Sequence, residues 1–157
     1  MKNIFAIALI FVTAAATAGD IDKRQVLHLT ELQRDHVLTE MRALLSGTQK
    51  ILDALHKEDM AAVAAHARSL GMGMAHKGED HLKAVLPREF MQLGMSVHKA
   101  FDQIAADAET LKDPRHTLLQ LSESMKKCVA CHDSYQIHIK ERPATQRIYS
   151  PDHRHHH

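Results

Sequence analysis

Apolar residues recur at spacings of three and four along most of this chain, and no useful length of it alternates with a period of two. β-branched residues are sparse as well. The spacing predicts four amphipathic helices over about 23–56, 59–70, 87–111 and 113–138. Helices of this kind, joined by short connections and without strands, predict an all-α fold, an antiparallel four-helix bundle.

Residues typical of helix ends mark several of these boundaries. The second helix opens with Glu58 and Asp59, and Gly71 is expected to end it as a C-terminal cap. Asp113 is the expected N-cap of the fourth helix, with Pro114 at its first position. The glycine-dotted stretch 71–86 predicts a connection with room for one short helix.

The N-terminus resembles a secretory signal peptide. Lys2 precedes an apolar run over 4–12, and small residues follow, ending in Ala16-Thr17-Ala18. A membrane-spanning helix needs about 20 apolar residues, so this run is too short to be an anchor. We therefore expect a signal peptide over 1–18, one domain over 19–142 and a disordered, His-rich tail over 143–157, with no membrane anchor after cleavage.

Composition excludes some classes of function. The formal net charge is only +1, so nothing resembles the strongly basic face of a nucleic-acid-binding protein. Trp is absent and aromatic residues make up 4% of the chain. A core with so few aromatic side chains favours, without requiring, a large flat cofactor that fills part of it.

The two cysteines of the chain lie together in Cys128-Val129-Ala130-Cys131-His132. C-x-x-C-H is the attachment motif of a c-type haem, in which the thiols form thioethers and the histidine binds iron as its proximal ligand. The motif therefore predicts one covalently attached haem c. A zinc site would need about four ligands, and there is no second cysteine pair. A redox dithiol would be expected to follow a strand and open a helix.

The motif falls on the predicted fourth helix, where residues at i, i+3 and i+4 share a face. Cys128, Cys131 and His132 have this spacing, so all three side chains are expected on one side. That side is predicted to be the inward stripe of the helix. The residues of the predicted stripe are Leu118, Leu121, Met125, Val129 and His132.

An exported helical bundle with one C-x-x-C-H near its C-terminus resembles the class II c-type cytochromes, the cytochrome c′ and cytochrome c-556 family. The run from Cys128 to Tyr135 is similar to that family's C-x-x-C-H-x-x-[FY]; the likeness in architecture covers about 23–140, whereas the likeness in residues is mostly confined to the last helix. The family usually carries Arg or Lys four positions after the histidine, where this chain has Gln136. The resemblance implies a periplasmic electron carrier, not an enzyme, that serves redox partner proteins, and it allows a homodimer.

In this family the residue opposite the proximal histidine decides the function. Methionine there suits electron transfer, whereas an apolar residue leaves the iron open to nitric oxide or carbon monoxide. Met41 on the first helix is the leading candidate for the distal ligand. A rival alignment places Leu38 over the iron and Arg34 beside a haem propionate. His36 and His28 are further alternatives for the ligand.

Two other groups of potential metal ligands are weaker candidates. Met72, Met74 and His76 have the residue types of a soft copper site, although such groupings arise easily by chance. Four of the last five residues are histidine, which fits either a purification remnant or a weak metal-binding end. A non-haem dithiol or metal-binding helical protein therefore stays open as a third class of function.

Overall fold

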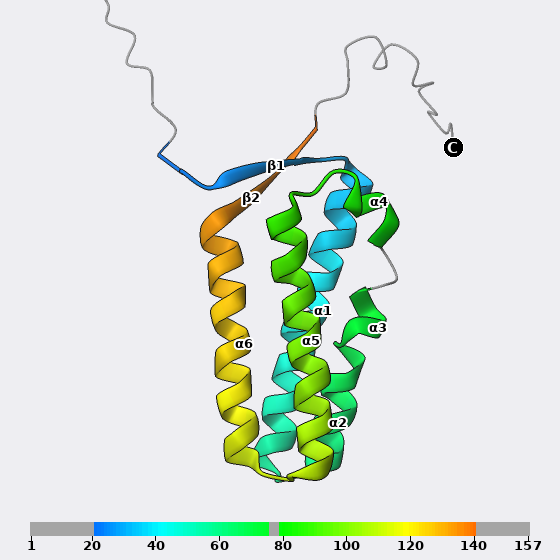
Figure 1. Cartoon of the computed structure of the whole chain (residues 1–157), viewed down its shortest axis with the longest axis vertical. Helices are drawn as coiled ribbons and strands as arrows, with labels where there is room; N and C mark the ends of the chain where they lie inside the picture. The colour runs from blue at the N-terminus through cyan, green and yellow to red at the C-terminus, as the bar shows by residue number, and fades with distance from the viewer. Residues whose placement is uncertain (1–20, 76–78, 141–157) are drawn as a thin grey trace, which may run out of the picture.

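The computed structural model describes residues 21–75 and 79–140, and this part of the chain is mostly helical, which confirms the predicted helical class. The predicted signal peptide, the predicted tail and His76 lie outside the described residues. Figure 1 shows the longer helices side by side, with a pair of strands crossing one end. The elements in chain order are β1 (Gln25–Leu29), α1 (Glu31–His56), α2 (Met60–Ser69), α3 (Met72–Ala75), α4 (Glu79–Lys83), α5 (Arg88–Thr110), α6 (Pro114–Ser134) and β2 (Tyr135–Ile139).

The helix starts follow from local capping chemistry. Asp59 accepts a hydrogen bond from the amide of Ala62, and Asp113 caps α6 with Pro114 in its first turn, as predicted. Thr30 and Gln33 form a reciprocal capping box at the start of α1. This cap explains why the first helix begins at Glu31, so the predicted start near residue 23 is wrong.

The prediction that the chain has no strands is wrong at both ends of the described region. β1 pairs in parallel with β2, in a register that joins Gln25 to Tyr135 and Leu29 to Ile139. The last helix therefore ends at Ser134 rather than near residue 138. Leu27 and Leu29 of β1 are buried against the helices, whereas His28 between them is exposed. A strand this short is stable only when a partner strand supplies its hydrogen bonds.

The closely packed helix pairs of the described residues are α1 with α2, α2 with α5, α3 with α5, and α5 with α6. Their apolar side chains form two clusters. The larger, which we call the lower cluster, includes Ile51, Val63, Phe101, Ile104 and Leu121. The smaller, which we call the upper cluster, lies near the strands and comprises Leu27, Leu29, Val37, Leu82, Leu86 and Phe90.

The role expected of Gly71 is also corrected. No glycine among the described residues has a positive φ, so Gly71 is not a left-handed helix cap. A Cβ at this position would collide with the Asp102 carboxylate, which accepts a hydrogen bond from the Met72 amide at 3.0 Å. Close approach of α5, rather than backbone conformation, therefore requires glycine there.

Candidate functional site

The C-x-x-C-H motif occupies the last two turns of α6 (Figure 1). Cys128 and Cys131 are half-buried free thiols, and His132 is exposed. Because the segment is helical, the spacing i, i+3, i+4 puts the two sulfurs and the imidazole on one side of the helix. This is the arrangement that a single ring held by both thiols and by the histidine requires.

The inward stripe predicted for this helix is wrong in all but one residue. Leu121 is buried, whereas Leu118, Met125 and Val129 are 48%, 47% and 56% exposed. The buried row of α6 is instead Thr117, Leu121 and Ser124, and Cys128 and Cys131 continue that row toward the C-terminus.

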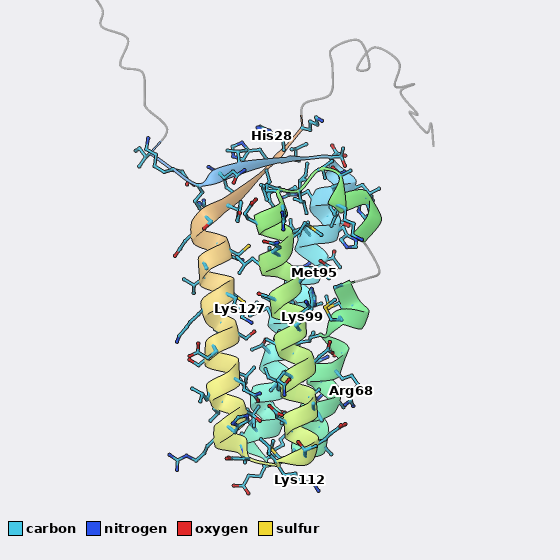
Figure 2. The ribbon with its side chains drawn as sticks, in the orientation of Figure 1. His28, Arg68, Met95, Lys99, Lys112 and Lys127 are labelled. Carbon is cyan, nitrogen blue, oxygen red and sulfur yellow. The ribbon has the colours of Figure 1, made fainter. Side chains whose placement is uncertain are left out.

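Apolar residues on α6 cover the buried row and the flank beside it, so periodicity alone cannot choose between them. Packing against α5 fixes the choice: Lys127 Nζ donates to the Ser96 carbonyl at 3.0 Å, and Figure 2 labels Lys127 on α6 beside α5. Within the described residues α5 is the one helix that packs closely on α6. The flank that carries Met125 and Val129 therefore extends an apolar surface beyond the packed core, next to His132.

Met41 and Cys131 contact the same apolar cluster. Both are half-buried and pack against the upper cluster, together with Tyr135 and Ile137. The structure thus brings the leading candidate for the distal ligand to the same end of the molecule as the motif. Leu38 is half-buried, and Arg34 is exposed.

The histidine alternatives face other partners. The His36 ring lies edge-on to His81 of α4, with the ring centroids 5.0 Å apart. His28 lies opposite His138 across the strand pair, with the ring centroids 6.2 Å apart. Neither His81 nor His138 belongs to the motif.

Burial controls the chemistry of both thiols. It raises the pKa of Cys128 and of Cys131, and the Cys128 thiol donates to the Ser124 carbonyl at 3.7 Å. The motif also lies at the C-terminal end of α6, where the helix dipole disfavours a thiolate. A reactive dithiol needs the opposite, a depressed thiol pKa at a helix N-terminus. The geometry therefore disfavours redox dithiol chemistry.

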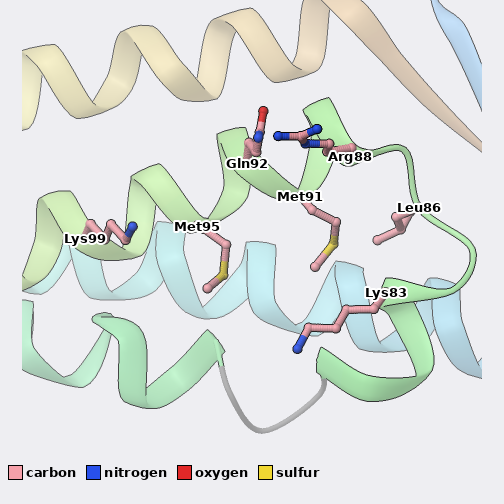
Figure 3. A pocket seen from close by; sticks show the side chains of 7 residues that line it. All are labelled: Lys83, Leu86, Arg88, Met91, Gln92, Met95 and Lys99. Carbon is pink, nitrogen blue, oxygen red and sulfur yellow. The ribbon is translucent and has the colours of Figure 1, made fainter.

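A groove away from the motif lies beside α4 and α5. It has a volume of about 680 Å³, and Figure 3 shows Met91 pointing from α5 toward Lys83. Its lining residues are Lys83, Leu86, Arg88, Met91, Gln92, Met95 and Lys99. Cys128, Cys131 and His132 are not among them, so the motif rather than this groove defines the candidate site.

Other metal chemistry finds little support in the described residues. No group of three or more His, Cys, Asp or Glu side chains there is placed to hold a metal ion. Met72 and Met74 lie on α3, and the third member of that candidate, His76, is outside the described part. No helix in 21–75 or 79–140 has the length and hydropathy needed to cross a bilayer.

Comparison of the chain with protein-family models, with curated proteins and with solved structures found no match. The residues of the site are therefore the features of the described chain that indicate a function. One contribution to that site is invisible to motif analysis. Arg24, one residue before β1, reaches the C-terminal end of α6, and only the strand pairing reveals this proximity.

Proposed function

We propose that the protein is an exported monohaem c-type cytochrome that carries single electrons. The observation that carries this proposal is the C-x-x-C-H motif in the last two turns of α6, with both thiols half-buried on the row that faces the core. In this proposal α1, α2, α5 and α6 form an antiparallel four-helix bundle of the class II cytochrome type, and α6 is its haem-binding helix.

The residues present fit a haem c. Cys128 and Cys131 would hold its edge as thioethers, and His132 would bind the iron. The exposed apolar flank with Met125 and Val129 offers a surface for a flat apolar ring beside His132. The buried hydroxyl of Ser124 has no hydrogen-bond partner one turn before Cys128, which marks a place where the packing without a cofactor is incomplete.

When bound, a haem c supplies a one-electron couple between ferric and ferrous iron. The protein's own residues fix the ring, set its potential and exclude water from part of it. The upper cluster provides an apolar surround at the motif, and Met41, which packs against the same cluster, is the proposed distal ligand. Arg34, exposed on α1, is the proposed propionate partner.

The proposed location of the protein is the periplasm. The signal-peptide pattern over 1–18 supports export to the periplasm, where a redox partner protein would exchange electrons with the haem. The alternative is a five-coordinate haem protein that binds nitric oxide or carbon monoxide. It would apply if Leu38, half-buried one turn before Met41, covered the iron instead.

Expression of the full chain with haem-maturation machinery tests the proposal. We expect a covalent haem that is lost when Cys128 and Cys131 are replaced by serine. We also expect a low-spin ferrous form that does not bind carbon monoxide. A chain without covalent haem would overturn both haem functions.

Substitution of Met41 then separates electron transfer from gas binding. Met41→Leu should give a high-spin form that binds carbon monoxide, because leucine cannot ligate iron. Met95→Leu on α5 is the matched control and should keep the wild-type spectrum. Wild-type protein that is already high-spin and binds carbon monoxide would contradict electron transfer and support the alternative.

A further inference from the structure

Arg24 joins the N-terminal end of the described chain to the haem-attachment motif. Its Nη1 donates to the carbonyl of His132 at 3.2 Å and to that of Tyr135 at 3.5 Å. Its Nε donates to Asp22 Oδ1 at 3.0 Å, and its backbone amide donates to the same oxygen at 3.0 Å. Asp22 thus fixes the guanidinium, which leaves Nη1 directed at the end of α6.

These contacts complete the C-terminal cap of α6. The last carbonyls of a helix have no partner within the helix and need other donors. The Tyr135 amide donates to the Cys131 carbonyl, and the Ser134 hydroxyl donates to the Ala130 carbonyl at 2.7 Å. The His132 carbonyl receives Arg24, a cation at the helix end where the dipole favours positive charge.

The backbone of Arg24 is tied to the same segment. Gln136 Nε2 donates to the Arg24 carbonyl at 3.1 Å, and the strand register begins one residue later with Gln25 opposite Tyr135. Arg24 therefore holds 132–136, a segment more than 100 residues further along the chain, through both its side chain and its backbone. The same Gln136 occupies the place where a cation was expected from the sequence resemblance.

We propose that Arg24 is a positioning residue for His132. By capping α6 it keeps the last turn helical, and this turn sets the imidazole in its place relative to Cys128 and Cys131. An uncapped end would fray, because the last turn of a helix makes few other hydrogen bonds. The role toward the iron depends on the proposed haem function, whereas the capping role does not.

Amide hydrogen exchange tests the capping role with or without haem. In Arg24→Gln, residues 132–136 should exchange at least tenfold faster than in the wild type, with α2 and α5 unchanged. Arg68→Gln is the matched control, since Arg68 pairs with Glu109 at 2.7 Å on α2 and α5, away from the motif. Asp22→Asn keeps the guanidinium but removes its anchor, so its effect should be intermediate.

An acid titration of the histidine–iron bond in the haem-loaded protein distinguishes a residue that positions His132 from one that only stabilises the fold. Arg24→Gln should retain covalent haem yet lose the histidine–iron bond at a higher pH during acid titration, and Arg24→Lys should restore part of the wild-type midpoint. The proposal is overturned if exchange over 132–136 matches that of Arg68→Gln, or if exchange accelerates while the acid midpoint stays fixed. A wild type without covalent haem would instead overturn the proposed function, and the role toward iron with it.

Discussion

Leu121 is the one large side chain that α6 buries in the lower cluster, and its truncation tests which face of the motif helix is turned inward. Leu121 is 4% exposed. Leu121→Ala removes three buried carbon groups, which at about 0.8 kcal/mol each is worth about 2.4 kcal/mol. The residual cavity adds to this cost, so the expected loss in the free energy of unfolding is about 3 kcal/mol.

The assay is thermal or urea unfolding of the folded chain, followed by circular dichroism. The roughly 120 described residues imply that 1 kcal/mol shifts Tm by about 4 °C, so Leu121→Ala should lower Tm by about 12 °C. Leu119→Ala is the matched control on the same helix. Leu119 is 60% exposed, and its truncation should cost less than about 1 kcal/mol.

Leu121→Ala must lower the free energy of unfolding by more than Leu119→Ala does. If Leu119→Ala cost as much as Leu121→Ala, or if Leu121→Ala cost under about 1 kcal/mol, the buried row of α6 would be misplaced. Cys128 and Cys131 continue that row, so the inward placement of the two thiols would then fail as well. A haem held against the core by both cysteines requires this placement.

Three further predictions address the ends, the thiols and the helix contacts. Hydrogen bonds from Arg24 lower the pKa of Asp22 from 3.8 to about 2, so the pairing is complete above about pH 4 and is lost as pH falls toward 2; an NMR titration of Arg24→Gln should return the midpoint toward 3.8. Both motif thiols of the haem-free chain should alkylate more slowly than free cysteine, because burial raises their pKa, and faster alkylation would indicate an activated dithiol. Gly94→Ala, which meets open space on α5, should stabilise the fold by about 0.5–1 kcal/mol. Gly47→Ala should destabilise it by about 1–2 kcal/mol, because its Cβ would lie 2.5 Å from Leu70 Cδ1; equal stability of the two variants in urea would contradict this close approach.

Local chemistry made several helix boundaries predictable. Asp59 and Asp113 cap their helices as their residue types indicate, because an N-cap needs only the amides of the next turn. The strands were missed because β1 and β2 depend on each other across the whole fold. A signal was present in the alternation of Leu27 with Leu29 and of Tyr135 with Ile137, although each run is short.

The sequence by itself determined the helical class, the starts of α2 and α6 and the motif that predicts a covalent haem, because these depend on residues within a few positions of one another. Only the tertiary structure decided which side of α6 is buried, since apolar residues cover two sides and packing against α5 selects one. It also decided that Met41 and Cys131 contact one cluster, and that Arg24 caps the helix that carries His132. These contacts join residues far apart in the chain, 108 positions for Arg24 and His132, and such contacts leave no local pattern in the sequence.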